Sequence, residues 1–148
     1  MRARSIKLRG TWSGAPADKV TLDYGDRCRR RIAMTGDSGL AFLLDLAATT
    51  CLQDGDALLL EDGRLVEIKA AAEDLLEIKG HDALHLMTLA WHLGNRHLAA
   101  QIERERIVIR YDPVIAHMLE HQGARLREVH EPFNPEGGAY SAHHDHEH

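Results

Sequence analysis

The spacing of apolar residues changes near residue 70, and this change constrains the fold more than any other feature of the sequence. Before it, short apolar stretches are separated by turn residues such as those at 36–39, 54–55 and 62–63, a pattern typical of strands joined by tight turns. After it, apolar residues recur every three or four positions over residues 81–95, as on the buried face of a helix. The sequence therefore predicts an α+β protein that begins with a small all-β domain.

Residues 1–74 are the expected all-β domain. RCRRRIAMT and LAFLLDL flank GDSG as the strands of one hairpin, and ALLLE and RLVEI flank Asp62-Gly63, a dipeptide that suits a type I′ turn. The arginines of RCRRR favour a solvated edge strand that resists pairing with another sheet. A docking patch for an acidic partner is the alternative. AAAED, residues 70–74, is the expected connector to the next domain.

Residues 75–135 predict the element order βαββαβ of a ferredoxin-like domain. LLEIKG is the first strand, and residues 81–95 form a helix that Gly94-Asn95 ends in a left-handed conformation. Two strands flank Arg104-Glu105, a second helix runs from Asp112-Pro113 to Gly123, and RLREVHEPF is the last strand. The expected buried positions of the first helix include Ala83, Leu86, Met87, Ala90, Trp91 and Leu93.

Composition argues against several classes of protein. A net charge of −5 argues against a broad nucleic-acid-binding surface. The sequence contains no run of 18 apolar residues, so a membrane-spanning helix is not expected. MRARSIKLRG lacks the apolar core of a secretory signal. Cys28 and Cys51 fit no CxxC pattern and are expected to be free thiols. We therefore expect a cytoplasmic protein that binds neither nucleic acid nor a membrane.

Histidine is the residue that points to chemistry, because all eleven histidines lie at residue 81 or later. Residues 136–148 are rich in Gly, Pro and His and are expected to form a flexible tail. Imidazole suits nickel, copper and zinc, so the tail is interpreted as a metal-binding segment. A purification tag and a solvated tail are the alternatives. The tail donors are His143, His144, His146 and His148.

The remaining histidines are weaker candidates. His97 alone would hold a metal weakly, unless a two-fold axis brought it to its own copy; otherwise it is a surface or capping residue. His81, His85 and His92 share one helix face, and His117 and His121 form a second pair four residues apart. A solvated polar face is favoured over chelation for both sets. An HExxH motif, a phosphate-binding glycine loop and a nucleophile elbow are missing from the sequence, so an enzyme is not expected.

Three stretches together resemble the urease accessory protein E family, the nickel metallochaperones of urease maturation. They are DGDALLLEDGRLVEI, HLGNRHL and PFNPEGGAY. The resemblance implies a β domain for partner or peptide contact, a ferredoxin-like metal-binding domain and a homodimer that works with the urease accessory GTPase and the apo-urease complex. It also implies that His97 binds nickel at the dimer interface together with the tail histidines. Zinc or copper could occupy the same site.

The sequence departs from some members of that family, which carry further histidines just after an arginine-tyrosine pair. Here Arg110-Tyr111 is followed by DPVI, so an accessory site on that segment is not expected, and His117, a turn later, is not a substitute. A metal buffer or sensor without a dedicated client is the alternative function. A metal-dependent hydrolase would need a fixed three-ligand site with an open position, and no such cluster is visible in the sequence.

Overall fold

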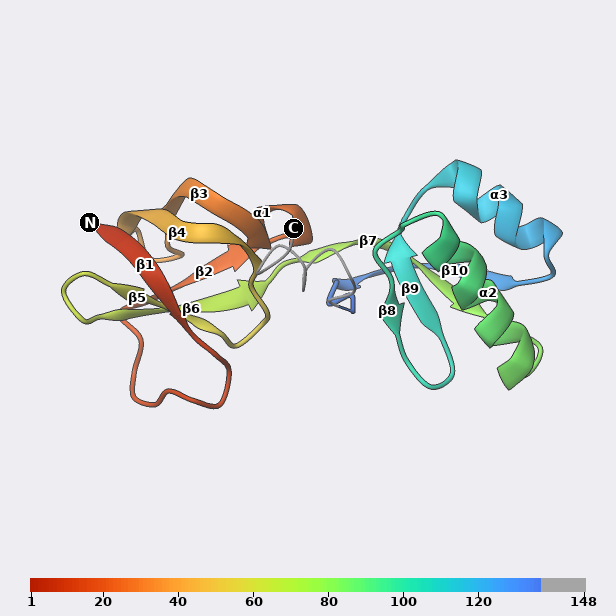
Figure 1. The fold of residues 1–148 in the computed structure, drawn as a ribbon, viewed down its shortest axis with the longest axis horizontal. Coiled ribbons are helices and arrows are strands. Elements are labelled where there is room, and N and C mark those ends of the chain that lie inside the picture. Colours follow the sequence, from red (N-terminus) through yellow and green to blue (C-terminus); the bar gives the residue numbers. More distant parts are fainter. Residues whose placement is uncertain (137–148) are drawn as a thin grey trace. The chain divides into compact units, whose positions relative to one another are not determined.

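The structure, a computed structural model, describes residues 1–136 of the chain. Within these residues the chain forms two compact units, Met1–Ala71 and Ala72–Glu136. Figure 1 shows a β-rich first unit and a second unit that adds two helices to a sheet. The expected α+β class with an N-terminal β domain is confirmed. No helix among residues 1–136 has the length and apolar character needed to cross a membrane.

The N-terminal unit is a mixed sheet with the strand order β2-β6-β5-β1-β4-β3. Strands β1 and β4 pair in parallel, as do β2 and β6, and the other neighbours are antiparallel. A single helical turn, α1, makes the unit not strictly all-β. The elements are β1 (Arg2–Lys7), β2 (Asp18–Leu22), α1 (Tyr24–Arg27), β3 (Cys28–Thr35), β4 (Ala41–Cys51), β5 (Ala57–Leu60) and β6 (Leu65–Ala70).

Both predicted hairpins are present, as β3–β4 and β5–β6. The expected type I′ turn at Asp62-Gly63 is wrong, because that turn needs a positive φ at both central residues and only Gly63 has one, at +89°. The Leu60 N–H donates to Arg64 O and the Gly63 N–H to Leu60 O, which fits a longer loop that closes on a left-handed glycine. Strand β3 lies at the sheet edge, as its arginines predicted.

Asp18 fastens the β3–β4 loop to the start of β2. Its carboxylate accepts the backbone N–H groups of Lys19, Ser38 and Leu40 at 2.8–3.2 Å. Burial by itself raises the pKa of Asp18, but these donors outweigh it and hold the pKa below 3.8. A buried carboxylate is therefore kept ionised by backbone donors.

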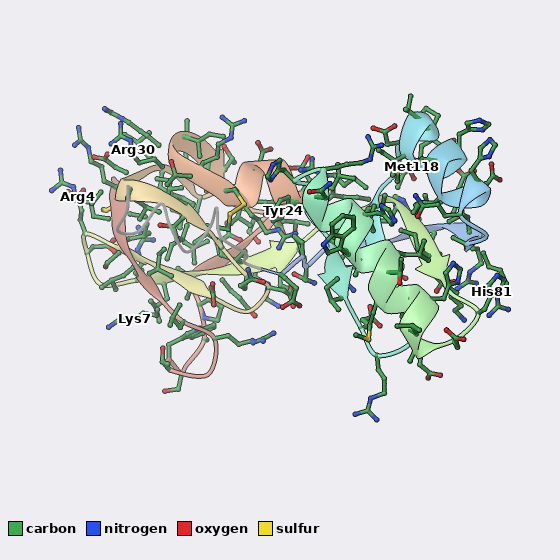
Figure 2. All side chains as sticks on the ribbon, turned by 45° about the vertical axis from the view of Figure 1, so that its right-hand side comes forward. Arg4, Lys7, Tyr24, Arg30, His81 and Met118 are labelled. Atoms are coloured by element: carbon green, nitrogen blue, oxygen red, sulfur yellow. A yellow bond between two sulfur atoms is a disulfide. The ribbon has the colours of Figure 1, made fainter. Side chains whose placement is uncertain are left out.

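Cys28 and Cys51 form a disulfide (Figure 2), so the expectation of free thiols was wrong. The two residues lie directly opposite each other on β3 and β4. Cysteines that meet across strands need no short sequence spacing, since the fold supplies the proximity. The bond ties the end of α1 to the last residue of β4.

The C-terminal unit is an antiparallel sheet with the strand order β10-β7-β9-β8. The expected connector at 70–74 is reduced to Ala71, because β6 ends at Ala70 and β7 begins at Ala72. Residues 72–74 pair with β10 instead. The elements are β7 (Ala72–Lys79), α2 (Ala83–Asn95), β8 (Gln101–Ile102), β9 (Ile107–Arg110), α3 (Pro113–His121) and β10 (Arg125–Pro132).

Side-chain caps explain where the two helices begin. Asp82 accepts the His85 N–H at 2.8 Å and starts α2. Asp112 accepts the N–H groups of Val114 and Ile115 and starts α3, with Pro113 at the first helical position. Gly123, at φ +80°, ends α3 as predicted.

Both helices pack on one face of this sheet. Their buried side chains share a core with β7 and β9, which places α2 and α3 in one layer over the strands (Figure 1). The expectation that Met87 and Trp91 are buried was wrong: they are 66% and 64% exposed, and Ala83 is exposed too. The core members from α2 and α3 are Leu86, Leu89, Leu93, Ile115 and Leu119.

Candidate metal centre

His97 lies just beyond α2, in a left-handed conformation with φ +59°. The Arg96 N–H donates to Leu93 O, and the His97 N–H donates to Gly94 O at 3.0 Å. The expected left-handed conformation at Gly94-Asn95 was wrong, because neither residue has a positive φ. His97 adopts that conformation instead. A side chain at positive φ costs roughly 1 kcal/mol relative to glycine. The fold holds His97 in this conformation although glycine would suit the backbone better.

The His97 side chain is exposed at the edge of an open cleft of 520 Å³. The cleft lies where the segment after α2 meets the turn from β9 to α3. Within residues 1–136 no group of three or more His, Cys, Asp or Glu side chains could hold a metal ion. His97 can thus supply one donor of a site that other ligands must complete. The lining residues are His97, Leu98, Ala99, Ile109, Arg110, Tyr111, Asp112 and Ile115.

Residues 134–136 are anchored by hydrogen bonds to residues 100–101, which follow His97 closely in the sequence. The Glu136 N–H donates to Ala100 O at 2.9 Å, and the Asn134 N–H donates to the Gln101 side chain at 2.9 Å. Ala100 is three residues from His97, so their Cα atoms are at most about 11 Å apart. The last described residue is therefore held near the His97 segment.

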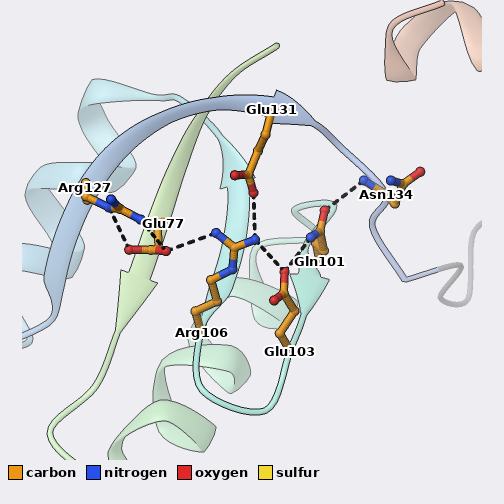
Figure 3. Close-up of polar contacts among 7 residues, drawn as sticks. All are labelled: Glu77, Gln101, Glu103, Arg106, Arg127, Glu131 and Asn134. Carbon is orange, nitrogen blue, oxygen red and sulfur yellow. Dashed lines mark hydrogen bonds and ion pairs between the residues drawn. The ribbon is translucent and has the colours of Figure 1, made fainter. Parts of the chain in front are cut away.

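A charged network supports this anchor (Figure 3). Arg106 lies at its centre, 3.0 Å from Glu77, 2.7 Å from Glu131 and 2.9 Å from Glu103. Glu103 in turn accepts from Gln101 at 2.6 Å, and Gln101 accepts the Asn134 N–H. The network thus connects β7 and β10 to the segment that carries Ala100.

The charges in this network stabilise one another. Glu77, which is buried, accepts two hydrogen bonds from Arg127 and one from Arg106. Hydrogen bonds from Arg127, and then from Arg106, hold the pKa of Glu77 below its ordinary 4.5 despite the burial. The Glu103 contact in turn raises the pKa of Arg106. Glu77, Glu103, Arg106 and Arg127 are therefore all charged near neutral pH.

The four predicted tail ligands, His143, His144, His146 and His148, lie outside the described residues. Residues 110–116 contain no histidine, and the cleft that His117 lines is a different one from the cleft at His97. His130 is exposed on β10, where its Nδ1 lies 3.0 Å from Asp74. His92 packs edge-on against Trp91.

His85 has a structural role rather than the solvated or chelating one considered from the sequence, whereas His81 is exposed, as a solvated face predicts. Their rings stack with centroids 4.5 Å apart. His85 Nδ1 accepts the His81 N–H at 2.9 Å, and its Nε2 lies 2.8 Å from Gln122 O. A carbonyl can only accept, so Nε2 carries the proton and Nδ1 uses its lone pair on His81. His85 has no lone pair left for a metal, and it joins the start of α2 to the end of α3.

Sequence reasoning missed the anchor formed by Ala100, Gln101, Asn134 and Glu136. Backbone hydrogen bonds between distant segments leave no residue-type signal. The available signal was NPE after the last strand, since Pro135 restricts the backbone of Asn134 to extended conformations. The contact of residues 134–136 with residues 100–101 can be seen only in the three-dimensional structure.

Two domain families cover nearly the whole chain. The N-terminal domain of the UreE urease accessory protein matches residues 2–71, and its C-terminal domain matches residues 73–148. A urease accessory protein UreE from Bradyrhizobium sp. (strain BTAi1) is 57% identical over 141 residues, which are 95% of this chain and 68% of that protein. Those from Beijerinckia indica and Ruegeria pomeroyi are 55% and 56% identical, covering 99% and 93% of this chain and 87% and 89% of those proteins. The chain belongs to the UreE urease accessory protein family.

Proposed function

We propose that this chain carries nickel to urease during urease maturation, as an accessory protein and not as an enzyme. The proposed site joins His97 from two copies of the chain with the histidines at 143, 144, 146 and 148. The C-terminal unit would be a ferredoxin-like metal-binding domain; its element order βαββαβ and its strand order β10-β7-β9-β8 support this. Zinc and copper would compete for the same imidazoles.

The observation that carries this proposal is the hydrogen bond from Glu136 to Ala100. His143 is seven residues beyond Glu136, and seven residues can span at most about 25 Å. Ala100 is within about 11 Å of His97, so covalent geometry lets the tail histidines reach the His97 cleft of their own chain. A set of several imidazoles around His97 suits a carrier, because the ligands can be exchanged one at a time.

A homodimer is the proposed assembly, and an apolar stripe on α2 supports it. Leu84, Met87 and Trp91 are 71%, 66% and 64% exposed and share one face of the helix. Such a stripe on a folded unit is typical of an interaction surface. The stripe belongs to the helix that ends two residues before His97. The urease accessory GTPase and the apo-urease complex are the proposed partners, and the β domain is the proposed surface for partner or peptide contact.

Nickel titration by calorimetry tests the proposed site on the full chain. We expect His97→Ala to remove the tightest site, and replacement of the four tail histidines by asparagine to reduce the number of bound ions. His130→Asn is the matched control, since His130 is exposed on β10 and contacts Asp74. An unchanged tightest affinity in His97→Ala would rule the site out.

The pH dependence of nickel affinity distinguishes imidazole ligands from carboxylates. An imidazole must lose its proton to bind, and a free histidine titrates near ~6.5. We therefore expect affinity to fall steeply between about pH 7.5 and 5.5, with more than one proton taken up per ion released. A flat affinity over this range would mean that oxygen ligands dominate.

A further inference from the structure

Helix α3 carries a second pair of histidines, and its environment differs from that of His81 and His85. His117 and His121 are both exposed. Their ring centroids are 4.8 Å apart, with the rings nearly perpendicular at 80°. Within residues 1–136 neither ring makes a hydrogen bond or an ion pair with another group. Unlike His85, both rings therefore keep a lone pair that a cation can use.

The spacing of this pair suits one metal ion. Residues four apart on a helix lie one above the other, so two imidazoles can bind the same ion from one side. Imidazole prefers divalent copper, nickel and zinc over magnesium and calcium. Among the residues that the structure describes, no group of three or more His, Cys, Asp or Glu side chains could hold a metal ion, so this part of the chain supplies the site with two ligands.

The α3 pair is separate from the cleft at His97. His117 lines an open cleft of 370 Å³ together with Glu120 of the same helix and Leu126 and Glu128 of β10. His97 lines the other cleft, which contains neither His117 nor His121. The two clefts adjoin at Tyr111, which lines both, but neither histidine of the α3 pair lines the cleft at His97.

We propose that His117 and His121 form a second, two-ligand binding site on α3 for a divalent transition-metal ion of the copper, nickel and zinc type. The site depends on helix geometry alone and does not rest on the function proposed for His97. Two imidazoles hold an ion less tightly than a four-ligand site, so this site fills after the tighter ones and exchanges its ion readily.

Zinc titration followed by the imidazole signals in NMR tests this proposal, because zinc is diamagnetic and each ring is observed separately. The full chain is titrated, and single Asn variants at 117 and 121 assign the signals. We expect the His117 and His121 signals to shift together, at a lower zinc concentration than His92, an imidazole without a second histidine one turn away that packs on Trp91. In His117→Asn, the zinc concentration at which His121 shifts should rise at least tenfold, since even loss of a residue that merely orients a ligand costs about 10–100-fold in affinity.

His81→Asn is the matched control, since it breaks the other pair at the same spacing and should leave the α3 signals unchanged. Two results would overturn the proposal. One is that His117 and His121 shift only where His92 shifts. The other is that either ring responds to zinc equally well after its neighbour is replaced. His97→Ala should leave the α3 signals as they are, so failure of this site is distinguishable from failure of the His97 site.

Discussion

The two units of this chain combine similar apolar cores with different polar chemistry. The N-terminal unit has no histidine, and it is tied by a disulfide between β3 and β4. The C-terminal unit holds seven histidines within residues 81–130 and a network of ion pairs around Arg106 and Glu77. If the proposed metal ligands lie outside the N-terminal unit, stability and metal binding can be changed separately. The predictions below test that separation, in decreasing order of their effect on the free energy of unfolding.

The largest effects should come from the two cores. Leu44 and Leu89 are each 0% exposed, in the N-terminal and C-terminal cores respectively. Replacing either by alanine should destabilise its own unit by about 3–4 kcal/mol, through lost burial and the cavity left behind. Hydrogen exchange resolved by residue should show faster exchange in the affected unit. Equal acceleration in both units would show that the units unfold together.

Loss of the disulfide should affect only the N-terminal unit. Cys28 and Cys51 are 23 residues apart, and closing a loop of that size stabilises a fold by about 3 kcal/mol in the chain-entropy treatment. Thermal unfolding with and without a reductant measures the effect, with the Cys28→Ser/Cys51→Ser double variant as the control that no longer responds. If the reductant also lowered the unfolding temperature of the C-terminal unit, the disulfide would not act on the N-terminal unit alone.

The charged network should give the C-terminal unit its own acid sensitivity. The pKa of Glu77 is lowered by Arg127 and Arg106, so its stabilisation is complete above pH 4.5 and is lost as the pH falls through the lowered value. Glu77→Gln should destabilise the unit by about 2 kcal/mol at pH 7, because hydrogen bonds to a charged group are lost. The same change should flatten the pH dependence of that unit below pH 4.5.

Asp18→Asn is the matched variant in the other unit, since backbone N–H donors lower the pKa of Asp18. It should flatten the acid response of the N-terminal unit only. The free energy of unfolding of each unit, measured between pH 3 and 7 in both variants, shows which unit loses its acid response. If Glu77→Gln changed the acid response of both units, the assignment to one network would be wrong.

The smallest change in stability should accompany the largest change in metal binding. His97 has φ +59°, a conformation that glycine adopts without strain. His97→Gly should therefore leave the C-terminal unit unchanged or stabilise it by up to about 1 kcal/mol, while it removes the proposed nickel ligand. Chemical denaturation together with nickel titration measures both. A destabilised His97→Gly variant would mean that the imidazole supports the fold.

Local patterns were sufficient to predict most elements of this fold. The apolar stretches ALLLE and RLVEI around Asp62-Gly63 predicted the β5–β6 hairpin, and Asp112-Pro113 predicted the start of α3. These signals act within a few residues and located the elements, although the backbone at Asp62-Gly63 and after α2 differs from the expected one. The parallel pairs β1–β4 and β2–β6 were not predictable in this way, because they join strands separated by dozens of residues.

The candidate site was only partly accessible to sequence reasoning. The position of His97 after a helix was expected, but its left-handed backbone and the Glu136–Ala100 bond were not. Periodicity also counted Met87 and Trp91 as core, although Leu86, Leu89 and Leu93 fill the face toward the sheet. An apolar side chain at helical spacing can serve a core or a partner, and only the packed structure separates the two. Whether residues 143–148 ligate nickel remains a prediction.

Strands β7 and β10 pair along their whole lengths, from Arg125 opposite Lys79 to Pro132 opposite Ala72. The first residue of the C-terminal unit therefore sits beside the last residue of its final strand. A unit whose two ends meet in this way can be cut out, transplanted or circularly permuted without stretching its backbone. The C-terminal unit thus has ends that a single surface loop of another protein could join.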